Sequence, residues 1–195
     1  MDKVTLADLL NIAEYEQVRT ESRRDIMEHK AHRRVSLGPE ISLTFEDRRT
    51  VIYQIQEMMR AERMVDDAAI QEEIDVYNSL LPDEGELSAT LFIEITDAAH
   101  IKERLQQFLG LTDGDSLWLQ VGDELTYARF EEGRSAEDQI SSVHYLRFPL
   151  SPAAREGLHD PAPNVKLCID HRDYHFETVL AEEVRAALAG DLKPA

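Results

Sequence analysis

The sequence predicts an α+β fold, in which an N-terminal helical unit with a helix pair packs on a mainly antiparallel sheet with flanking helices. Three observations lead to this class. Apolar residues recur at helical spacing between residues 47 and 77. From Leu87 onward apolar and polar residues alternate instead, which is typical of strands. The segment from Asp170 to Asp173 has the composition of a hairpin tip, so the flanking strands are expected to pair antiparallel.

Two helices are expected before the first strand. Thr5 followed by Asp8 forms a capping-box pattern, and it starts a helix that carries four apolar residues inward: Leu6, Leu9, Leu10 and Ile12. A second helix over residues 14–34 is polar on most faces. Gly38-Pro39 then forces a turn.

A strand and the helix pair follow. Ile41, Leu43 and Phe45 alternate with polar residues, which predicts a half-buried strand. Two helices are expected over residues 47–64 and from Asp66 or Asp67 to residue 77, and their short connection makes them antiparallel or sharply angled.

Leu81 to Gly85 is the best candidate boundary in the chain. It divides residues 1–82, a helical unit with one or two short strands, from residues 83–195, an antiparallel sheet with two or three helices. Together the two parts are expected to form one compact globular unit.

The second half alternates cleanly at first, with a helix expected over residues 97–109. Further strands are predicted over residues 116–122, 125–131, 142–150 and 164–178, the last split by the hairpin tip. A final helix from Ala181 to Leu188 is expected to end at Gly190.

Composition limits the class of protein. Of 195 residues, 43% are apolar and 31% charged, which is typical of a globular protein. No apolar run approaches the roughly 20 residues that span a bilayer, and the N-terminus lacks a signal-peptide core, so we expect a cytoplasmic protein. The single cysteine, Cys168, excludes an internal disulfide and is expected to be a small buried side chain.

The formal charge of −18 argues against nucleic acid and anionic membranes as partners. The segment from Arg19 to Arg34 is the exception, with six Lys or Arg residues against three acids. This basic helix is expected to dock on the acidic body of the same chain or of a second subunit in a homo-oligomer. The sharper alternative is a site for an anionic ligand.

Two carboxylates fall on the apolar stripes of the helix pair, Glu62 on the first helix and Glu73 on the second. A buried carboxylate must be paired, protonated or metal-bound, because desolvating an isolated charge is costly. Internal ion pairs with Arg48, Arg60 or Arg63 would explain both acids. A functional carboxylate site is the alternative, because perturbed acids also cluster at such sites.

Histidines raise the question of a metal. His29 and His32 are three residues apart on one expected helix face, so with Glu62 and Glu73 they could hold iron or another divalent metal. His171 and His175 flank the hairpin tip and could face each other across it, although exposed turn polarity explains them as well. His144 shares a strand face with apolar residues, which favours a core histidine.

Familiar catalytic signatures are missing from the sequence. It has no glycine-rich phosphate loop, no His-Glu-x-x-His, no Gly-x-Ser-x-Gly and no Cys-x-x-Cys. The Glu-x-x-His pairs of di-iron helical bundles are also absent, so a ferritin-like fold is not expected.

Several segments resemble a bacterial family known as domain of unknown function (DUF) 3501. They are His32–Val35 with Leu37–Pro39, Tyr53–Met58 with Glu62-Arg63, Gln71–Glu73, Tyr77-Asn78 with Leu81-Pro82, and Ser141–Phe148. The family has no assigned reaction. The resemblance implies genes near rubrerythrin-like and iron-sulfur oxidoreductase proteins, and so a redox protein as partner. It also adds hydrogen-bonding groups and His144 to the candidate residues.

Three hypotheses of function follow, and the sequence leaves open whether the protein is an enzyme. The first is an accessory or binding protein in redox or iron-linked physiology, which binds a metal or a protein partner through the helix pair. The second is a metal-dependent hydrolytic or redox enzyme that uses the same carboxylates and histidines. The third is a small-anion or nucleotide binding module. The candidate functional residues are Arg33, Arg34, Tyr53, Gln54, Gln56, Glu57, Glu62, Glu73 and His144.

Overall fold

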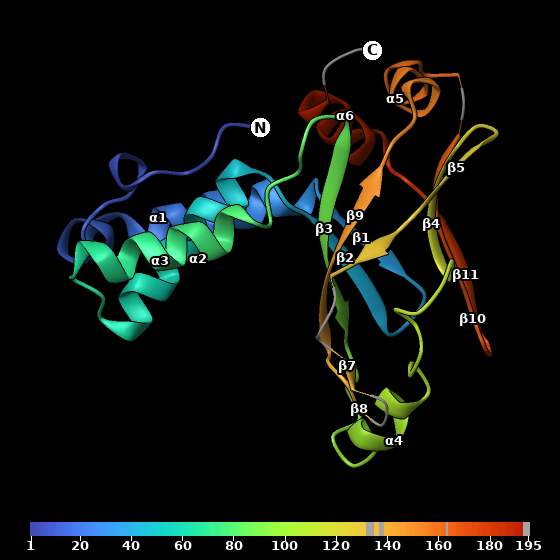
Figure 1. The fold of residues 1–195 in the computed structure, drawn as a ribbon, viewed down its shortest axis with the longest axis horizontal. Helices are drawn as coiled ribbons and strands as arrows, with labels where there is room; N and C mark the ends of the chain where they lie inside the picture. Colours follow the sequence, from blue (N-terminus) through green and yellow to red (C-terminus); the bar gives the residue numbers. More distant parts are fainter. Residues whose placement is uncertain (132–134, 137–138, 163, 193–195) are drawn as a thin grey trace.

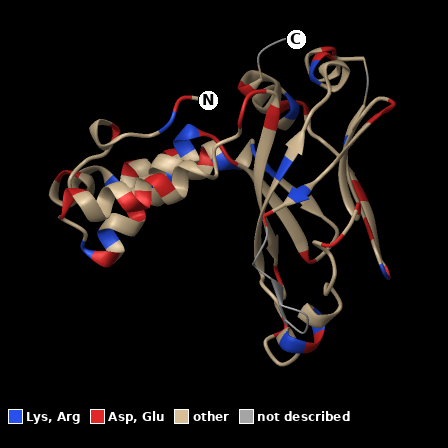
Figure 2. Cartoon of the chain, viewed as in Figure 1, with Lys and Arg blue, Asp and Glu red and all other residues tan. Residues whose placement is uncertain are grey.

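A computed structural model describes residues 1–131, 135–136, 139–162 and 164–192. It confirms the α+β class. A helical unit projects from a body built on two antiparallel sheets (Figure 1). Asp and Glu outnumber Lys and Arg by 39 to 21, and both kinds are spread over the helical unit and the sheets (Figure 2).

The helical unit has its own apolar core. Its helices are α1 (Ile12–Ala31), α2 (Arg48–Glu62) and α3 (Asp67–Asn78). The buried side chains that they and the neighbouring segments share are Val4, Val51, Ile55, Met59, Ile70, Ile74, Leu80 and Leu81. Asp66 caps α3, as predicted, by accepting hydrogen bonds from the amides of Ala68 and Ala69.

The prediction for the first helix is wrong in extent. The Thr5–Asp8 capping box is present, but it starts a single 3₁₀ turn (Leu6–Asp8) that ends at Leu9. Leu6 and Leu10 are 39% and 40% exposed, because the segment that reaches the core is the extended chain at Val4. Asn78 holds that chain through hydrogen bonds to both the amide and the carbonyl of Val4.

The first sheet has five antiparallel strands in the order β1-β2-β3-β9-β6. They are β1 (Arg34–Leu37), β2 (Ile41–Phe45), β3 (Glu86–Ile93), β6 (Arg129–Phe130) and β9 (Val143–Pro149). The helix expected over residues 14–34 therefore ends three residues early, and β1 takes up its last position. Gly38 turns the chain from β1 to β2 at a φ of 74°, and a Cβ there would lie 2.5 Å from Tyr174 Oη.

The second sheet has the order β11-β10-β4-β5. Its strands are β4 (Leu117–Val121), β5 (Glu124–Tyr127), β10 (Val165–His171) and β11 (Tyr174–Val179). The predicted hairpin tip joins β10 to β11. A short pair, β7 (Ser135–Ala136) and β8 (Gln139–Ile140), lies apart from both sheets.

Three more helices complete the body, namely α4 (Ile101–Gln106), α5 (Pro152–His159) and α6 (Glu182–Asp191). The sequence did not predict α5, and α6 continues through Gly190, where it was expected to end. The main apolar core includes residues from both sheets and from α5 and α6. No helix in the described part of the chain is long and apolar enough to cross a membrane.

The strand β2 is buried on both of its faces, which the sequence did not predict. Ile41, Leu43 and Phe45 contribute to the main core, as expected. Ser42 and Thr44 alternate with them and are nevertheless only 1% and 4% exposed. The same polar face continues across β3, because Thr44 pairs with Thr90 in the register of the sheet. The five-stranded sheet thus has buried polar side chains on one face, at β2 and β3, as well as a buried apolar face.

Candidate functional site

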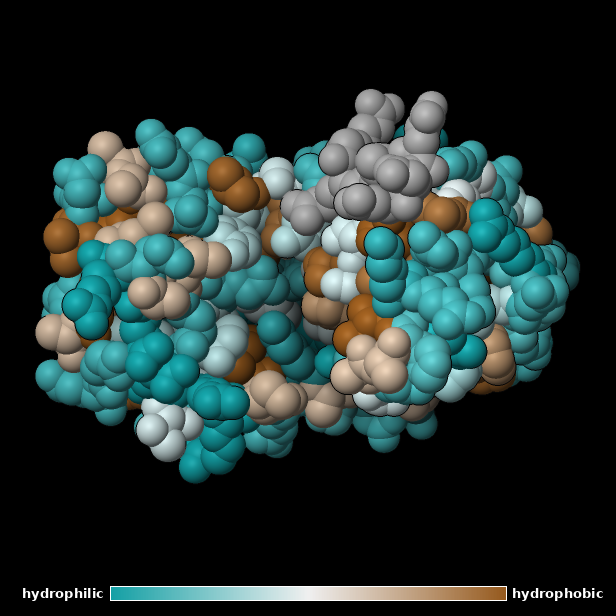
Figure 3. Space-filling view, turned by 90° about the horizontal axis from the view of Figure 1, so that it is seen from below, coloured by the Kyte–Doolittle hydropathy of each residue, from teal (hydrophilic) through white to brown (hydrophobic). Residues whose placement is uncertain are grey.

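The helical unit and the polar face of the first sheet enclose a groove, which we call the helix–sheet groove. Its volume is about 460 Å³. Seen from below, the molecule is hollowed between the helical unit and the sheets (Figure 3). The lining residues come from α2, α3, β3 and β9, and they are Tyr53, Gln54, Glu57, Met58, Arg60, Ala61, Tyr77, Thr90, Phe92, Val143 and Tyr145.

The buried carboxylate of Glu46 lies behind the polar residues of this groove. Glu46 follows β2 directly, is 2% exposed, and its amide donates to the carbonyl of Ser88. Its Oε2 accepts from the hydroxyl of Thr50 and its Oε1 from the hydroxyl of Thr90, each at 2.5 Å. Gln54 Nε2 lies 3.5 Å from Oε1. Among the described residues, no Lys, Arg or His comes within ion-pair distance of this carboxylate.

Sequence reasoning missed Glu46, although a signal was present. Glu46 occupies the polar phase of the β2 alternation, directly before Asp47, which caps α2. Both residues lie where the chain leaves β2 and enters α2, and the side chains of the sheet and of the first turns of α2 bury them there. A buried acid could have been inferred from that arrangement, but not from the alternation alone.

Glu57 is a structural ion-pair member at the edge of the groove. Both of its oxygens accept from Arg19 at 2.8 Å, and Oε1 also accepts from the hydroxyl of Tyr15 at 2.7 Å. The hydrogen bonds from Arg19 hold the pKa of Glu57 below its ordinary value. Burial, with Glu57 nearby, raises the pKa of Tyr53. The groove therefore presents the neutral phenol of Tyr53 beside an acid whose charge is balanced by Arg19.

Glu62 and Glu73 do not occupy the buried positions that the stripes predicted. Glu62 is exposed, because the apolar stripe of α2 ends at Met59 and the chain turns away at Arg63, which adopts a φ of 54°. Glu73 is partly exposed on α3. The arginines proposed as their partners bind other acids, with Arg48 on Asp8 and Arg60 on Glu16.

A second buried charge cluster joins the helical unit to the body. Arg33 is 2% exposed, donates through Nε to the carbonyl of Phe45, and forms ion pairs with Asp47 and Asp191. His29 Nε2 lies 2.6 Å from Asp47 Oδ2. Burial raises the pKa of Asp191, and the hydrogen bond from Arg33 opposes this shift. Since Arg33 is engaged by two acids, it is not available for an external anion.

The other basic and histidine candidates are dispersed. Arg34 is exposed and bonded to Glu94 at 2.6 Å, and His32 is exposed at the end of α1. In the part of the chain that the structure describes, no three His, Cys, Asp or Glu residues are grouped so that they could hold a metal ion. The structure therefore does not bring His29 and His32 together with Glu62 and Glu73.

Two candidate residues from the family-like segments have structural partners. Gln56 is buried and holds the N-terminal segment, because its side chain bonds both the amide and the carbonyl of Leu10. His144 is 1% exposed on the core side of β9, and its Nε2 lies 2.7 Å from the carbonyl of Ser141. This is the core histidine that its strand pattern favoured.

The hairpin histidines do not face each other, contrary to one expectation. His175 is paired with Asp170 in the register and lies 2.7 Å from its carboxylate, exposed to solvent. His171 pairs with Tyr174, so its side chain lies on the opposite face of the sheet, where it is buried. Burial lowers the pKa of His171 and raises that of the Cys168 thiol.

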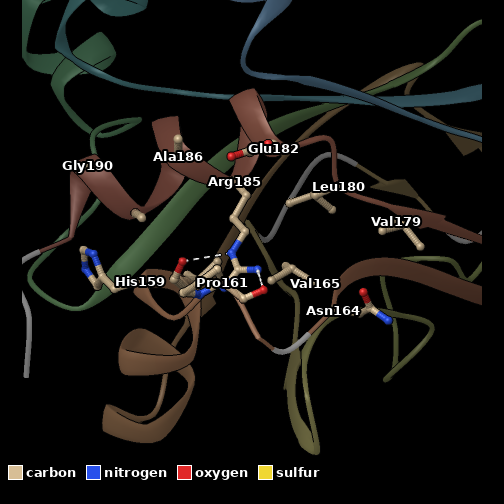
Figure 4. Close-up of a pocket in the computed structure, with 12 residues that line it drawn as sticks. His159, Pro161, Asn164, Val165, Val179, Leu180, Glu182, Arg185, Ala186 and Gly190 are labelled. Carbon is tan, nitrogen blue, oxygen red and sulfur yellow. Dashed lines mark hydrogen bonds between the residues drawn. The ribbon is translucent and has the colours of Figure 1, made fainter.

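A larger pocket of about 700 Å³ lies between α5 and α6 (Figure 4). Its central charged group is Arg185, which donates to the carbonyls of Gly157, Leu158 and Pro161. Arg185 thereby caps the C-terminal end of α5. None of its described lining residues lies in the segments that carry the family resemblance, whereas several lining residues of the helix–sheet groove do, so the groove is the better candidate site.

Comparison with known proteins gives a family but no activity. A family model described as "Protein of unknown function (DUF3501)" matches residues 3–192. A crystal structure of a protein of unknown function from Burkholderia pseudomallei K96243 is 35% identical, with a TM-score of 0.91. The match covers 98% of this chain and 100% of that one. No curated protein matches the sequence.

Proposed function

Because the chain belongs to the DUF3501 family, a family of proteins of unknown function, we propose a function from the site itself. The protein binds a small planar ligand in the helix–sheet groove and acts as a binding or accessory protein. One observation carries this proposal. Seven of the eleven lining residues lie in the segments that carry the family resemblance, and these segments are far apart in the sequence: Tyr53–Met58, Tyr77-Asn78 and Ser141–Phe148.

The shape and composition of the groove support a small ligand. Ligand pockets usually have volumes of about 300–1,000 Å³ and apolar or aromatic walls with a few polar groups. The groove falls in this range at about 460 Å³, and its aromatic side chains come from four elements. Its polar groups gather near Gln54 and Thr90, beside the buried Glu46.

The chemistry of the lining favours binding over catalysis. Among the described residues that line the groove there is no histidine, cysteine or serine. Glu57 is a poor general base, because its pKa is lowered and both of its oxygens are bonded to Arg19. Thr90 is the aliphatic hydroxyl among the described lining residues, and its hydrogen is bonded to Glu46 behind the groove, so we propose binding rather than covalent catalysis.

The redox or iron-linked role and the cytoplasmic location remain predictions from the sequence. One structural observation favours an acidic protein partner next to the groove. Arg23 and Lys30 have no acidic partner among the described residues, and Lys30 Nζ lies 5.6 Å from the centre of the Tyr53 ring. A double variant, Arg23→Glu with Lys30→Glu, is expected to abolish salt-sensitive binding of a rubrerythrin-like protein measured by calorimetry.

The groove itself is tested with a blocking variant. We expect a nuclear magnetic resonance screen of nucleosides, pteridines, indoles and flavins to shift the signals of Tyr53, Tyr77 and Tyr145. Ala61→Trp places a large ring in the lining and is expected to remove the shifts. Ala186→Trp is the matched control, because Ala186 is also an exposed helical alanine but lies in the pocket of Figure 4. A screen without groove shifts, or equal binding by both variants, would overturn the proposal.

A further inference from the structure

The hydrogen bonds around Glu46 indicate which planar ligand the groove selects, an inference that rests on the proposed function. We propose that the ligand is a nitrogen heterocycle whose edge carries two neighbouring N–H donors. Guanine and 2-amino-4-oxopteridine have this edge, which consists of a ring N–H beside an amino group. The polar groups of the groove would accept both hydrogen bonds.

The first step concerns the hydroxyl of Thr90. A threonine hydroxyl has one hydrogen to donate and two lone pairs. The Thr90 hydrogen is used by the Glu46 carboxylate at 2.5 Å, and the second oxygen of that carboxylate is bonded to Thr50 in the same way. Thr90 also lines the groove. Its hydroxyl oxygen can therefore offer a ligand only lone pairs.

The second step concerns Gln54, which lines the groove from the second turn of α2. Its amide nitrogen is turned toward Glu46, 3.5 Å from Oε1. An amide group is planar, with nitrogen and oxygen at opposite corners, so the carbonyl oxygen is the end left for the groove. Gln54 and Thr90 are thus both expected to act as acceptors toward a bound molecule.

The hydrogen bonds to Glu46 fix this polarity. Both of its oxygens accept, so neither Thr90 nor Gln54 can turn its donor toward the groove without leaving a buried carboxylate oxygen unsatisfied. A ligand oxygen in the same place would face the lone pairs of Thr90 and Gln54 with its own lone pairs, and no hydrogen bond would form.

The walls of the groove account for the planar ring. Tyr53, Tyr77, Phe92 and Tyr145 come from four different elements. Lys30 and Arg34 lie over two of these rings, with Arg34 5.8 Å from the centre of Phe92. Aromatic side chains held in this way offer flat surfaces against which a heterocycle can stack.

Two matched ligand pairs test the donor edge, with affinity measured by calorimetry. Xanthosine replaces the amino group of guanosine with an oxygen, and lumazine does the same for 2-amino-4-oxopteridine. We expect the amino member of at least one pair to bind about tenfold or more tightly than its oxo partner, because each mismatched contact leaves a buried acceptor unpaired. A difference in the guanosine pair identifies the ligand as a purine, and a difference in the pteridine pair identifies it as a pteridine.

Variants of the polar groups complete the test. Thr90→Val keeps the side-chain shape but removes the acceptor, and it is expected to lower the affinity for the amino ligand about tenfold. Thr44→Val is the control, because Thr44 pairs with Thr90 on the same face, is similarly buried and neither lines the groove nor bonds Glu46. In Glu46→Gln the new amide group can donate to the hydroxyl of Thr90, and the hydrogen of Thr90 can then turn toward the ligand. The ratio of the affinities for the amino and oxo ligands should therefore become smaller.

The outcomes separate this inference from the proposed function. Equal binding of amino and oxo ligands, or a preference that neither Thr90→Val nor Glu46→Gln changes, would overturn the donor edge. If indoles or flavins bind in the groove and no purine or pteridine does, the donor edge fails while the binding function stands. If no planar compound binds in the groove, the proposed function itself fails.

Discussion

The two faces of the five-stranded sheet are buried by different neighbours and consist of different residues. The face toward the second sheet carries apolar side chains such as Leu43, Leu91 and Phe148, all fully buried. The face toward α2 carries Thr44, Glu46 and other polar side chains that are scarcely more exposed. An apolar face can stabilise the fold by burial alone, whereas each polar group needs a partner and so fixes where its donors and acceptors point.

The largest effect on stability is expected from the apolar face. The Phe148 ring lies 6.0 Å from that of Phe45, centre to centre, and is fully buried. Phe148→Ala leaves a cavity and is expected to lower the free energy of unfolding by about 3–5 kcal/mol. Guanidinium denaturation measures the change. A loss below about 1 kcal/mol would show that this face is not the core that the packing implies.

A change on the polar face is expected to act in the opposite direction. Glu46→Gln removes a buried carboxyl group that has no ion-pair partner among the described residues and keeps the side-chain shape. We expect the free energy of unfolding to rise by about 1 kcal/mol, as happens when a strained functional group is relaxed. The same denaturation experiment checks it. Destabilisation by a similar amount would mean that the two hydroxyl bonds outweigh the burial of the charge.

The edge of the helix–sheet groove is expected to respond to pH. Arg19 lowers the pKa of Glu57, so the ionised carboxylate stabilises the fold above its ordinary pKa of 4.5, and this stabilisation is lost as the pH falls through the lower folded-state value. Glu57→Gln should cost about 0.5–1 kcal/mol at neutral pH. Thermal denaturation across pH should show the gap to the wild type closing in acid. A gap independent of pH would exclude the ion pair as its cause.

The smallest effects are expected outside both faces. His32 and Glu62 are exposed, so His32→Ala and Glu62→Gln should each change the free energy of unfolding by less than about 0.5 kcal/mol. Elemental analysis of the protein purified without chelators should give the same metal content for both variants and the wild type. A metal that is lost in either variant would return these residues to a metal site.

The sequence predicted the elements whose signals are local. The cap of α3, the helix pair and the hairpin joining β10 to β11 depend on residues a few positions apart. The strand β1 was missed because its four residues follow a charged helix without a break in composition. The extent of α2 was overestimated by two residues, because periodicity carries no information about where the chain turns. Glu62 was expected to be buried because the apolar stripe was extended beyond Met59.

The candidate site was predicted only in the part that lies on α2. Tyr53, Gln54 and Glu57 line the groove. They were candidates because they lie in one family-like segment. Thr90 and Glu46 were not found, since alternation assigns polar residues to an open face and says nothing about a helical unit that lies beside it. Knowing which surface α2 contacts requires the long-range fold.

The ion pair between Arg33 and Asp191 bears on how the chain is made. Its two residues are 158 positions apart, one at the junction of α1 with the sheet and the other in α6. During synthesis at about 5–20 residues per second, the helical unit and the first strands leave the ribosome seconds before Asp191 does. During this interval Arg33 cannot form its ion pair with Asp191. The junction that holds the helical unit against the sheet is therefore among the last parts of the protein to be completed.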